Sequence, residues 1–335
     1  MTEKGNTHTR PVVAITMGDP AGVGPEVTVK ALVEEGIHRL SRPLVVGDAG
    51  VLAKASDMLG AALAVRPVAR VAEARFERGR MDVLDLANVK WETLGVGKVS
   101  AMAGRAAVEY VVKAVELAQA GEIDAIVTGP INKEAINLAG YDYIGHTEIL
   151  ADLTQTPRCT TMLAAGSLRV THVTRHVPLR AVADVLTRDR VMETIVATAE
   201  GLRHLGIEQP RLGVAALNPH GGEGGLLGRE EMEEIAPAVE KARRMGIDAR
   251  GPYPADSIFF RAIAGEFDAV VAMYHDQGHI PVKVHDFEGS YTVTLGLPIV
   301  RTSVDHGTAF DIAWKGTSSP RSMIEAIKAA VFIAR

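Results

Sequence analysis

Short apolar runs rich in valine, isoleucine and alanine alternate along this chain with longer amphipathic stretches. Runs of this kind are typical of parallel strands that helices cover on both faces. The sequence therefore predicts an α/β fold. The candidate strands are residues 12–16, 43–47, 125–129, 169–174, 211–217 and 268–274, with shorter ones near Val68, Val83 and Thr292. The clearest helices are predicted over residues 101–123, 189–207 and 230–247.

The composition indicates a globular protein that acts on small molecules. Of the 335 residues, 47% are hydrophobic and 23% are charged, which is enough apolar content for two domains or one large one. The formal net charge of -5 gives no electrostatic reason to expect nucleic acid or an anionic membrane surface as a partner. We therefore expect a small-molecule ligand, no nucleic acid and no membrane.

Cysteine content and hydropathy favour the cytoplasm. The single cysteine, Cys159, cannot form an internal disulfide, and it excludes a zinc site built from paired thiolates. The starting segment MTEKGNTHTRPVVAITMG has no apolar stretch long enough for a signal peptide, and nowhere do about 18 apolar residues run together. A reducing, cytoplasmic location is the expectation.

Three histidines follow candidate strands at the point where each strand ends. His176 follows residues 169–174, His220 follows residues 211–217 and His275 follows residues 268–274. Because ligands bind at the carboxyl ends of parallel strands, these side chains are expected to converge. Three imidazoles on one divalent ion leave a position open for substrate, and nitrogen ligands favour zinc or another late divalent metal. Each histidine taken alone has a capping or structural role as its alternative.

Two glycine-rich segments are candidates for ligand binding. The turn GDPAGVGPE begins at Gly18 after the first strand, but its spacing is not that of a G-x-G-x-x-G motif, so a tight turn and a ligand-lining loop both stay open. The second segment, residues 292–316, is dense in Gly, Thr, Ser and Asp. Backbone amides around Gly307 with the side chains of His306, Thr308 and Asp311 could hold an adenosine or a phosphate.

Charged and helix-terminal residues supply candidates for an anionic substrate. Lys283 and Arg301 are the nearest cations, because arginine offers a bidentate fork and lysine a point charge. His146 and Thr147 lie at the predicted start of an apolar helix, where free N–H groups favour an anion. The alternative for Thr147 is a simple helix cap.

Eight segments, in the same order from about residue 12 to residue 316, are similar to those of the 4-hydroxythreonine-4-phosphate dehydrogenase family. They are GDPAGVGPE, TGPINKEAI, GHTE, HVPLR, NPHGGEGGLLGREE, GPYPADS, YHDQGHIPVK and GLPIVRTSVDHGTAFDIA. Within this family, HIPVK resembles a branch that acts on four-carbon sugar-acid phosphates. The stretch HGTAFDIAWKG is also similar to the adenosine-binding segment of decarboxylating dehydrogenases.

The resemblance implies a two-lobed α/β/α fold like that of isocitrate and isopropylmalate dehydrogenases, with an active-site cleft between the lobes. We expect residues 1–130 and 295–335 to form the cofactor-side lobe. Residues 131–294 are expected to form the lobe for metal, substrate and dimerisation. A homodimer in which both subunits build each active site is also implied.

The resemblance assigns roles to individual residues. It implies a divalent metal held by His176, His220 and His275, with zinc expected first and cobalt or magnesium as alternatives. It places substrate contacts at His146, Thr147, Asp256, Lys283, Thr292 and Arg301, and Lys283 and Asp256 are the candidate catalytic residues. It places NAD, or alternatively NADP, at His306, Gly307, Thr308 and Asp311.

The implied reaction is an oxidation followed by a decarboxylation. NAD would oxidise 4-phosphooxy-L-threonine to a β-keto acid, and loss of carbon dioxide would leave 3-amino-2-oxopropyl phosphate for pyridoxal phosphate synthesis. The alternative substrates are D-threonate and D-erythronate 4-phosphate, which would yield dihydroxyacetone phosphate.

Two residues depart from the family pattern. Thr292 stands nine residues after Lys283, where the threonine-phosphate enzymes typically have an asparagine. Its hydroxyl is shorter than an amide, so a substrate contact is altered there. Trp314 stands where the related decarboxylating enzymes usually have a glycine.

Two other functional classes compete with the dehydrogenase interpretation. Three histidines around an open metal position would also serve a metal-dependent aldolase or hydrolase of sugar phosphates. A regulator that binds a phosphorylated metabolite without turnover is the non-catalytic alternative. Formation of NADH from substrate separates the dehydrogenase from both.

Overall fold

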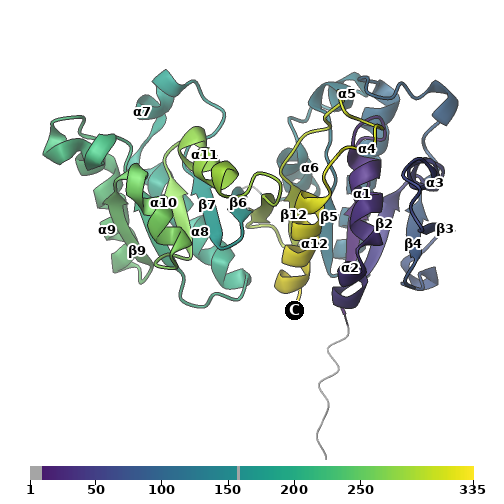
Figure 1. Cartoon of the computed structure of the whole chain (residues 1–335). Coiled ribbons are helices and arrows are strands. Elements are labelled where there is room, and N and C mark those ends of the chain that lie inside the picture. Colours follow the sequence, from purple (N-terminus) through teal and green to yellow (C-terminus); the bar gives the residue numbers. More distant parts are fainter. Residues whose placement is uncertain (1–9, 157–158) are drawn as a thin grey trace, which may run out of the picture. The chain divides into compact units, whose positions relative to one another are not determined.

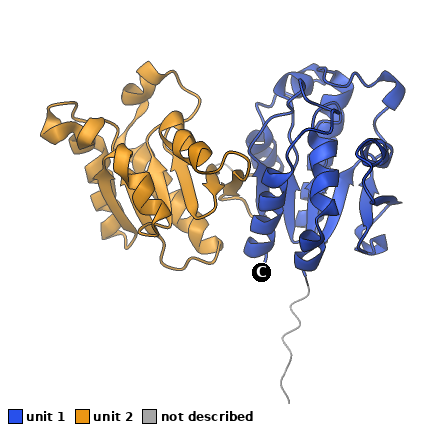
Figure 2. Cartoon of the chain, viewed as in Figure 1, with its two compact units in different colours: residues 1–153, 299–335 blue, residues 154–298 orange. Residues whose placement is uncertain are grey.

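A computed structural model describes residues 10–156 and 159–335, and the chain divides into two compact units (Figure 2). Unit 1 consists of residues 1–153 and 299–335, and unit 2 of residues 154–298. The expected lack of a signal peptide concerns in part residues 1–9, which lie outside the described residues. None of the helices in the described ranges combines the length and apolar content that a membrane span requires.

Unit 1 is built on a parallel sheet with the strand order β3-β4-β2-β1-β5-β12 (Figure 1). The strands are β1 (Val12–Thr16), β2 (Arg42–Gly47), β3 (Ala64–Val68), β4 (Arg80–Asp85), β5 (Ala125–Thr128) and β12 (Arg301–Val304). Every residue of β1, β5 and β12 is buried, as expected for strands covered on both faces.

The helices of unit 1 form two groups, each of which packs together. One group contains α1 (Gly24–Val33), α2 (Glu35–Leu40), α3 (Ala49–Met58) and α12 (Arg321–Ile333), and the other contains α4 (Ala101–Gln119), α5 (Lys133–Leu138) and α6 (His146–Leu153). Short 3-10 turns form at η1 (Val71–Glu73) and η2 (Trp91–Thr93). The Ser100 side chain caps α4 by accepting from the N–H of Ala103 at 3.2 Å.

Unit 2 contains a mixed sheet with the strand order β11-β6-β7-β10-β8-β9. The strands are β6 (Thr160–Ala165), β7 (Leu168–His172), β8 (Arg211–Ala215), β9 (Asp248–Tyr253), β10 (Ala269–Ala272) and β11 (Tyr291–Leu295). β6 runs antiparallel to β7 and β11, whereas β7, β10, β8 and β9 are parallel. The carboxyl ends of these four parallel strands therefore share one edge of the sheet.

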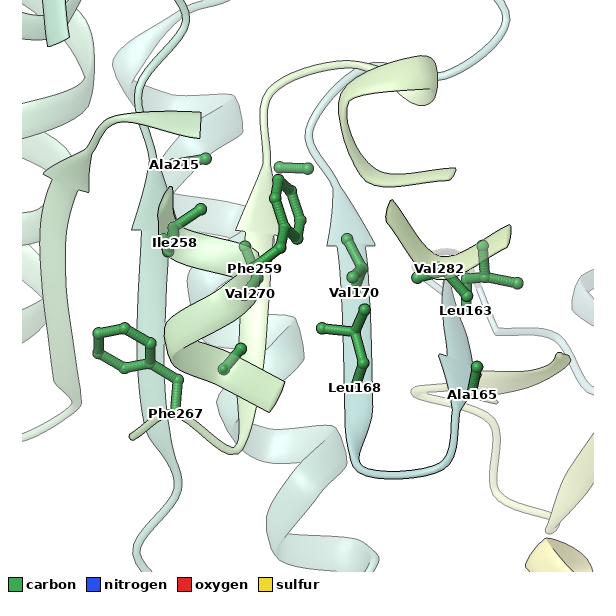
Figure 3. Close-up of a cluster of buried hydrophobic side chains, with 12 residues drawn as sticks. Leu163, Ala165, Leu168, Val170, Ala215, Ile258, Phe259, Phe267, Val270 and Val282 are labelled. Carbon is green, nitrogen blue, oxygen red and sulfur yellow. The ribbon is translucent and has the colours of Figure 1, made fainter. Parts of the chain in front are cut away.

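Helices pack against both faces of the unit 2 sheet. They are α8 (Arg188–His204), α9 (Ala236–Arg244), α10 (Ala255–Ile263) and α11 (His275–His285), with shorter turns at η3 (Leu179–Ala181), α7 (Val182–Val185), η4 (Pro219–Gly225) and η5 (Glu231–Ile235). Figure 3 shows the core on one face, where Val170 of β7 lies beside Phe259 of α10 and Val282 of α11. On the other face, the Thr171 and Thr198 hydroxyls are 2.8 Å apart and join β7 to α8.

The predicted α/β class is confirmed, and each of the six principal strand ranges contains a strand. The strands β6, β9 and β12 lie in segments without a predicted strand. β12 is buried although it reads Arg-Thr-Ser-Val, because its polar side chains form hydrogen bonds within unit 1. The helix predicted over 230–247 forms without a break from Glu231 to Arg244, but it begins with the π-turn η5 and continues as α9, and Pro237, which has no N–H to donate, lies near their junction.

The boundary between the units differs from the expected one. Residues 131–153, which we expected in the second lobe, belong to unit 1 because α5 and α6 pack against α4. His146 and Thr147 therefore lie in unit 1. The functions predicted for the two lobes remain predictions.

Candidate active site

The three histidines predicted as metal ligands follow neighbouring strands of unit 2. His176 lies in the bend after β7, His275 begins α11 after β10, and His220 lies in η4 after β8. These strands are adjacent in the order β7-β10-β8, so the predicted positions at strand ends are confirmed. The sheet thereby places all three residues along one edge.

Four imidazoles gather where β7 and α11 meet. The ring centroids of His176 and His275 are 6.1 Å apart, and His275 stacks on His279 at 3.6 Å with a 9° angle between the ring planes. His172 lies 4.7 Å from His279. Burial is the main cause that holds the pKa of His172 well below its usual range, followed by the nearby His279 and His275, so His172 is neutral near pH 7.

His220 is exposed on the η4 loop. Its Nδ1 lies 2.7 Å from Oε1 of Glu223, and this hydrogen bond is the main cause that raises the pKa of His220. Asp256, in the first turn of α10, raises the pKa of His220 further, so the predicted catalytic carboxylate acts on the His220 loop. The same arrangement recurs at His275, whose Nδ1 lies 2.6 Å from Oδ1 of Asp276.

The donors fit a late divalent metal in their chemistry. Metal-binding histidines commonly hold a carboxylate on the ring nitrogen that does not bind the metal, as Glu223 and Asp276 do here. The contacts of His220 and His275 with these carboxylates are made through Nδ1 and do not involve Nε2. Within residues 10–156 and 159–335, however, no three His, Cys, Asp or Glu side chains form a ready-made metal site. The predicted metal thus remains a prediction.

Unit 1 brings two of the predicted substrate contacts together. Arg301, at the start of β12, is 3% exposed and donates from Nη2 to the hydroxyl of Thr128 at 2.6 Å and from Nε at 3.2 Å. His146 begins α6 as predicted, and its Nε2 is shielded from solvent. Burial, and then the charge of Arg301, hold the pKa of His146 well below its usual range. The end of β5 therefore carries a guanidinium beside a neutral imidazole.

The other residues predicted to contact substrate lie on three elements. Thr147 is the second residue of α6, inside the helix and beyond the capping position. Lys283 lies on α11, where its Nζ donates to the hydroxyl of buried Ser290 at 3.1 Å and lies 4.9 Å from the Phe287 ring. Thr292 is half-buried on β11, opposite Leu163 of β6.

The two glycine-rich segments meet in unit 1. The N–H of Val23 donates to the carbonyl of Thr308 at 3.0 Å, and a Cβ at Gly22 would lie 2.8 Å from the same oxygen. Gly18 adopts a φ of +76° and packs on Pro130, where a Cβ would meet the carbonyl at 2.4 Å. The close approach requires glycine at both positions, so the tight-turn interpretation is supported without excluding a ligand.

Residues predicted for the cofactor follow β12 directly. Nδ1 of His306 lies 3.0 Å from the carbonyl of Gly307, Gly307 is exposed, and Thr308 is buried. The carbonyl of Asp311 accepts from Lys315 at 2.6 Å. Open space around Gly307 leaves room for a ligand beside the backbone.

Trp314 adopts a φ of +60°, a left-handed conformation that favours glycine, which gives a physical reason for the glycine typical of related enzymes. Its Nε1 donates to the carbonyl of Pro20 at 3.0 Å, and its ring lies 4.8 Å from that of Trp91. These contacts hold the tryptophan against the turn that begins at Gly18.

Some residues of the site were not predicted. Asp19 is fully buried, and burial raises its pKa to about 6, while Oδ1 accepts from the N–H of Ala21 at 2.8 Å. Glu223 and Glu231 flank the His220 loop. The three-residue spacing of His220 and Glu223 is a signal that could have found that pair, whereas nothing in the local sequence predicts the burial of Asp19.

Comparison with known proteins places the chain among dehydrogenases. The family model described as "Pyridoxal phosphate biosynthetic protein PdxA" matches residues 39–330. A 4-hydroxythreonine-4-phosphate dehydrogenase from Desulforapulum autotrophicum is 49% identical over 325 residues, which cover 97% of this chain and 96% of that protein. A protein from Symbiobacterium thermophilum, provisionally named D-threonate 4-phosphate dehydrogenase, is 49% identical over 320 residues, or 96% of each.

Solved structures agree with this assignment. The 4-hydroxythreonine-4-phosphate dehydrogenase of Klebsiella pneumoniae superposes with a TM-score of 0.89 at 43% identity, covering 97% of this chain and all of that one (100%). The fold and the relatives thus define a dehydrogenase. The chain belongs to the pyridoxal phosphate biosynthetic protein PdxA family, and the resemblance drawn from its motifs is confirmed.

Proposed function

We propose that this protein uses NAD to oxidise a four-carbon hydroxy acid that carries a 4-phosphate, and that the product then loses carbon dioxide. The observation that carries this proposal is the buried Arg301 beside His146 at the end of β5. A fixed guanidinium with a neutral imidazole donor is suited to a carboxylate or phosphate. The names of the relatives support a phosphorylated hydroxy acid.

Three phosphates of two kinds are candidate substrates. The first is 4-phosphooxy-L-threonine, which would give 3-amino-2-oxopropyl phosphate, and the relative from Desulforapulum autotrophicum supports it. The second is D-threonate or D-erythronate 4-phosphate, which would give dihydroxyacetone phosphate. The relative from Symbiobacterium thermophilum and the hydroxyl of Thr292 favour this second candidate.

We propose His176, His220 and His275 as the residues that would hold a divalent metal, with zinc first and cobalt or magnesium as alternatives. A bound metal would supply Lewis acidity at the substrate hydroxyl and stabilise negative charge during decarboxylation. Glu223 and Asp276 orient the imidazoles of His220 and His275 through Nδ1. His306, Gly307, Thr308 and Asp311 are the proposed contacts for NAD, with NADP as the alternative.

Lys283 and Asp256 are the proposed catalytic residues, with Lys283 as a proton carrier or a substrate anchor. The ammonium of Lys283 carries protons that the adjacent Ser290 hydroxyl can accept or pass on, and the same charge would anchor an anionic substrate. Asp256 acts through the field it exerts on the His220 loop. Replacing Lys283 would distinguish its two possible functions. Loss of a proton carrier lowers kcat, whereas loss of a substrate anchor raises KM.

We propose that the protein is a cytoplasmic homodimer with shared active sites. Ile280, Val284 and Phe287 are 60%, 82% and 71% exposed, and their spacing from α11 onwards aligns them along one side of the helix and its end. An exposed apolar row of this kind supports burial against a second copy. A content of one cysteine, Cys159, in 335 residues fits a reducing compartment.

The deciding experiment follows NADH and carbon dioxide with the three candidate phosphates and their unphosphorylated acids. Each is measured before and after chelation and again after zinc, cobalt or magnesium is restored. We expect NADH with a phosphorylated acid, loss of the rate on chelation and recovery on restoration. Turnover without NADH would support the aldolase or hydrolase, and tight binding without turnover would support the regulator.

A further inference from the structure

The loop that carries His220 has a left-handed backbone over consecutive residues. The φ angles are 53° at His220, 73° at Gly221, 78° at Gly222, 45° at Glu223 and 66° at Gly224. Glycine tolerates these angles, but His220 and Glu223 are side-chain-bearing residues in a conformation that L-amino acids disfavour. Such a run persists only where the surrounding structure holds it.

Glu231 supplies that support from below the loop. It is 3% exposed, and its Oε1 accepts from the N–H groups of Leu217 at 2.8 Å and Asn218 at 2.7 Å. Its Oε2 accepts from Nδ2 of Asn218 at 3.0 Å. One buried carboxylate thus receives three hydrogen bonds from the two residues that lead from β8 into the loop.

The loop fits closely around this carboxylate. A Cβ at Gly222 would lie 2.7 Å from Oε2 of Glu231, so the chain at 222 rests directly on the Glu231 carboxylate. Glu230 also accepts from Nδ2 of Asn218, at 2.7 Å. Consecutive residues both reach Asn218 at the start of the π-turn η5, and wide turns of this type often occur at functional sites.

We propose that Glu231 is a positioning residue, whose carboxylate fixes the left-handed loop so that His220 presents Nε2 for metal binding. The inference rests on the proposed function, because it takes His220 as a metal ligand. An ionised carboxylate suits the task because it only accepts hydrogen bonds. The amide introduced by Glu231→Gln would place an NH2 group either against the NH2 group of Asn218 or against the two backbone N–H groups, and a contact would be lost in both orientations.

The test compares the cobalt-loaded full-length enzyme with His220→Ala, Glu231→Gln, Glu231→Ala and the control Glu240→Gln. Glu240 is exposed on α9, where it pairs with Arg244 at 3.5 Å. The measurements are the Kd for Co²⁺, the visible Co²⁺ spectrum, and hydrogen exchange of the apo chain over residues 217–228. Hydrogen exchange reports the anchoring of the loop without any metal.

We expect Glu231→Gln to weaken Co²⁺ binding on the order of tenfold and Glu231→Ala by up to about a hundredfold. Exchange over 217–228 should be faster in both variants, and the KM for NAD should be unchanged. Wild-type Kd, spectrum and exchange in Glu231→Gln, with His220→Ala impaired, would overturn the inference alone. Wild-type Co²⁺ binding by His220→Ala would instead overturn the metal assignment on which it rests. If Glu231→Ala does not fold, Glu231→Gln decides.

Discussion

The backbone of Gly278 on α11 lies against the imidazole of His172 on β7, so closely that a Cβ at position 278 would be 2.3 Å from Nε2 of His172. The same Cβ would be 2.7 Å from Cγ1 of Val170. Neither neighbour can move freely, since both side chains are buried in the unit 2 core. This contact sets the distance at which the first turn of α11, with His275, packs on β7.

Replacing Gly278 with alanine should therefore destabilise the protein by about 1–3 kcal/mol, because the added methyl group overpacks the core. Urea unfolding measures the change. Gly36→Ala in α2 is the matched control, as a Cβ there meets no atom within 4 Å and alanine favours a helix. A Gly278→Ala variant as stable as the wild type would contradict the packing argument.

We expect the buried carboxyl group of Asp19 to make the stability of the protein depend on pH. Burial raises its pKa from 3.8 to about 6, so the folded chain holds this proton more tightly than the unfolded chain. The unfolded state loses the proton first, and stability falls as the pH rises from about 4 to about 6. Relative to Asp19→Asn, the wild-type free energy of unfolding should fall by about 3 kcal/mol over this range.

Urea titrations at several pH values measure this difference. Asp57→Asn, at an exposed position of α3, should leave the pH profile unchanged. Parallel profiles for wild type and Asp19→Asn would show that the Asp19 carboxyl titrates alike in the folded and unfolded chains.

We expect Arg301 to make the enzyme prefer a phosphorylated acid over the same acid without the phosphate. Replacing Arg301 with methionine keeps much of the volume but removes the charge beside His146, so kcat/KM for the phosphorylated acid should fall about 10- to 100-fold. Arg301→Lys should be intermediate, because lysine lacks the fork that reaches the Thr128 hydroxyl from two nitrogens. The KM for NAD should stay constant.

Steady-state kinetics with matched phosphorylated and unphosphorylated acids provide the measurement. Arg39→Met removes an arginine that is 62% exposed on α2 and should have no effect. Equal losses for both acids in Arg301→Met would show that Arg301 does not bind the phosphate, and would leave it a contact to the carboxylate that both acids share or a structural function.

The class of fold and the positions of the histidines follow from local patterns. Apolar runs such as residues 12–16 can be recognised as strands in the sequence, because helices cover both faces of the sheet and every side chain of such a strand is apolar or small. His176, His220 and His275 were found because parallel strands align their carboxyl ends. In contrast, β12 could not be predicted from an apolar run, because it contains the polar residues Arg301 and Ser303. Their burial depends on hydrogen bonds to Thr128, which lies 173 positions from Arg301 in the sequence.

Other features depend on tertiary contacts that sequence spacing does not encode. The unit boundary shifts because α5 and α6 pack on α4, which no composition change marks. In the sequence, Glu231 is one of several acidic residues at the start of a predicted helix. In the structure, its carboxylate is buried under the loop that carries His220. The proposed positioning function of Glu231 can be inferred only once the left-handed backbone conformation of residues 220–224 is known.

Thr292 predicts which substrate the enzyme prefers. A longer amide in Thr292→Asn both donates and accepts, so it should shift the ratio of kcat/KM toward 4-phosphooxy-L-threonine, away from D-threonate 4-phosphate, on the order of tenfold. Competition between the two substrates measures the ratio directly. Thr292→Val, which keeps the shape and removes the hydroxyl, is the comparison variant. An unchanged ratio in both variants would remove Thr292 from the substrate contacts.

The exposed side chain of Val284 provides a test of the oligomeric state. At 82% exposure it is the most exposed member of the apolar row that also contains Ile280 and Phe287. A glutamate in its place would have to be desolvated in an interface between two copies, so Val284→Glu should convert the proposed homodimer to a monomer. Light scattering after size exclusion measures the mass. Leu138→Glu, which alters a 60% exposed residue of α5, should leave the dimer intact. A dimeric Val284→Glu variant would show that α11 faces solvent in the assembly.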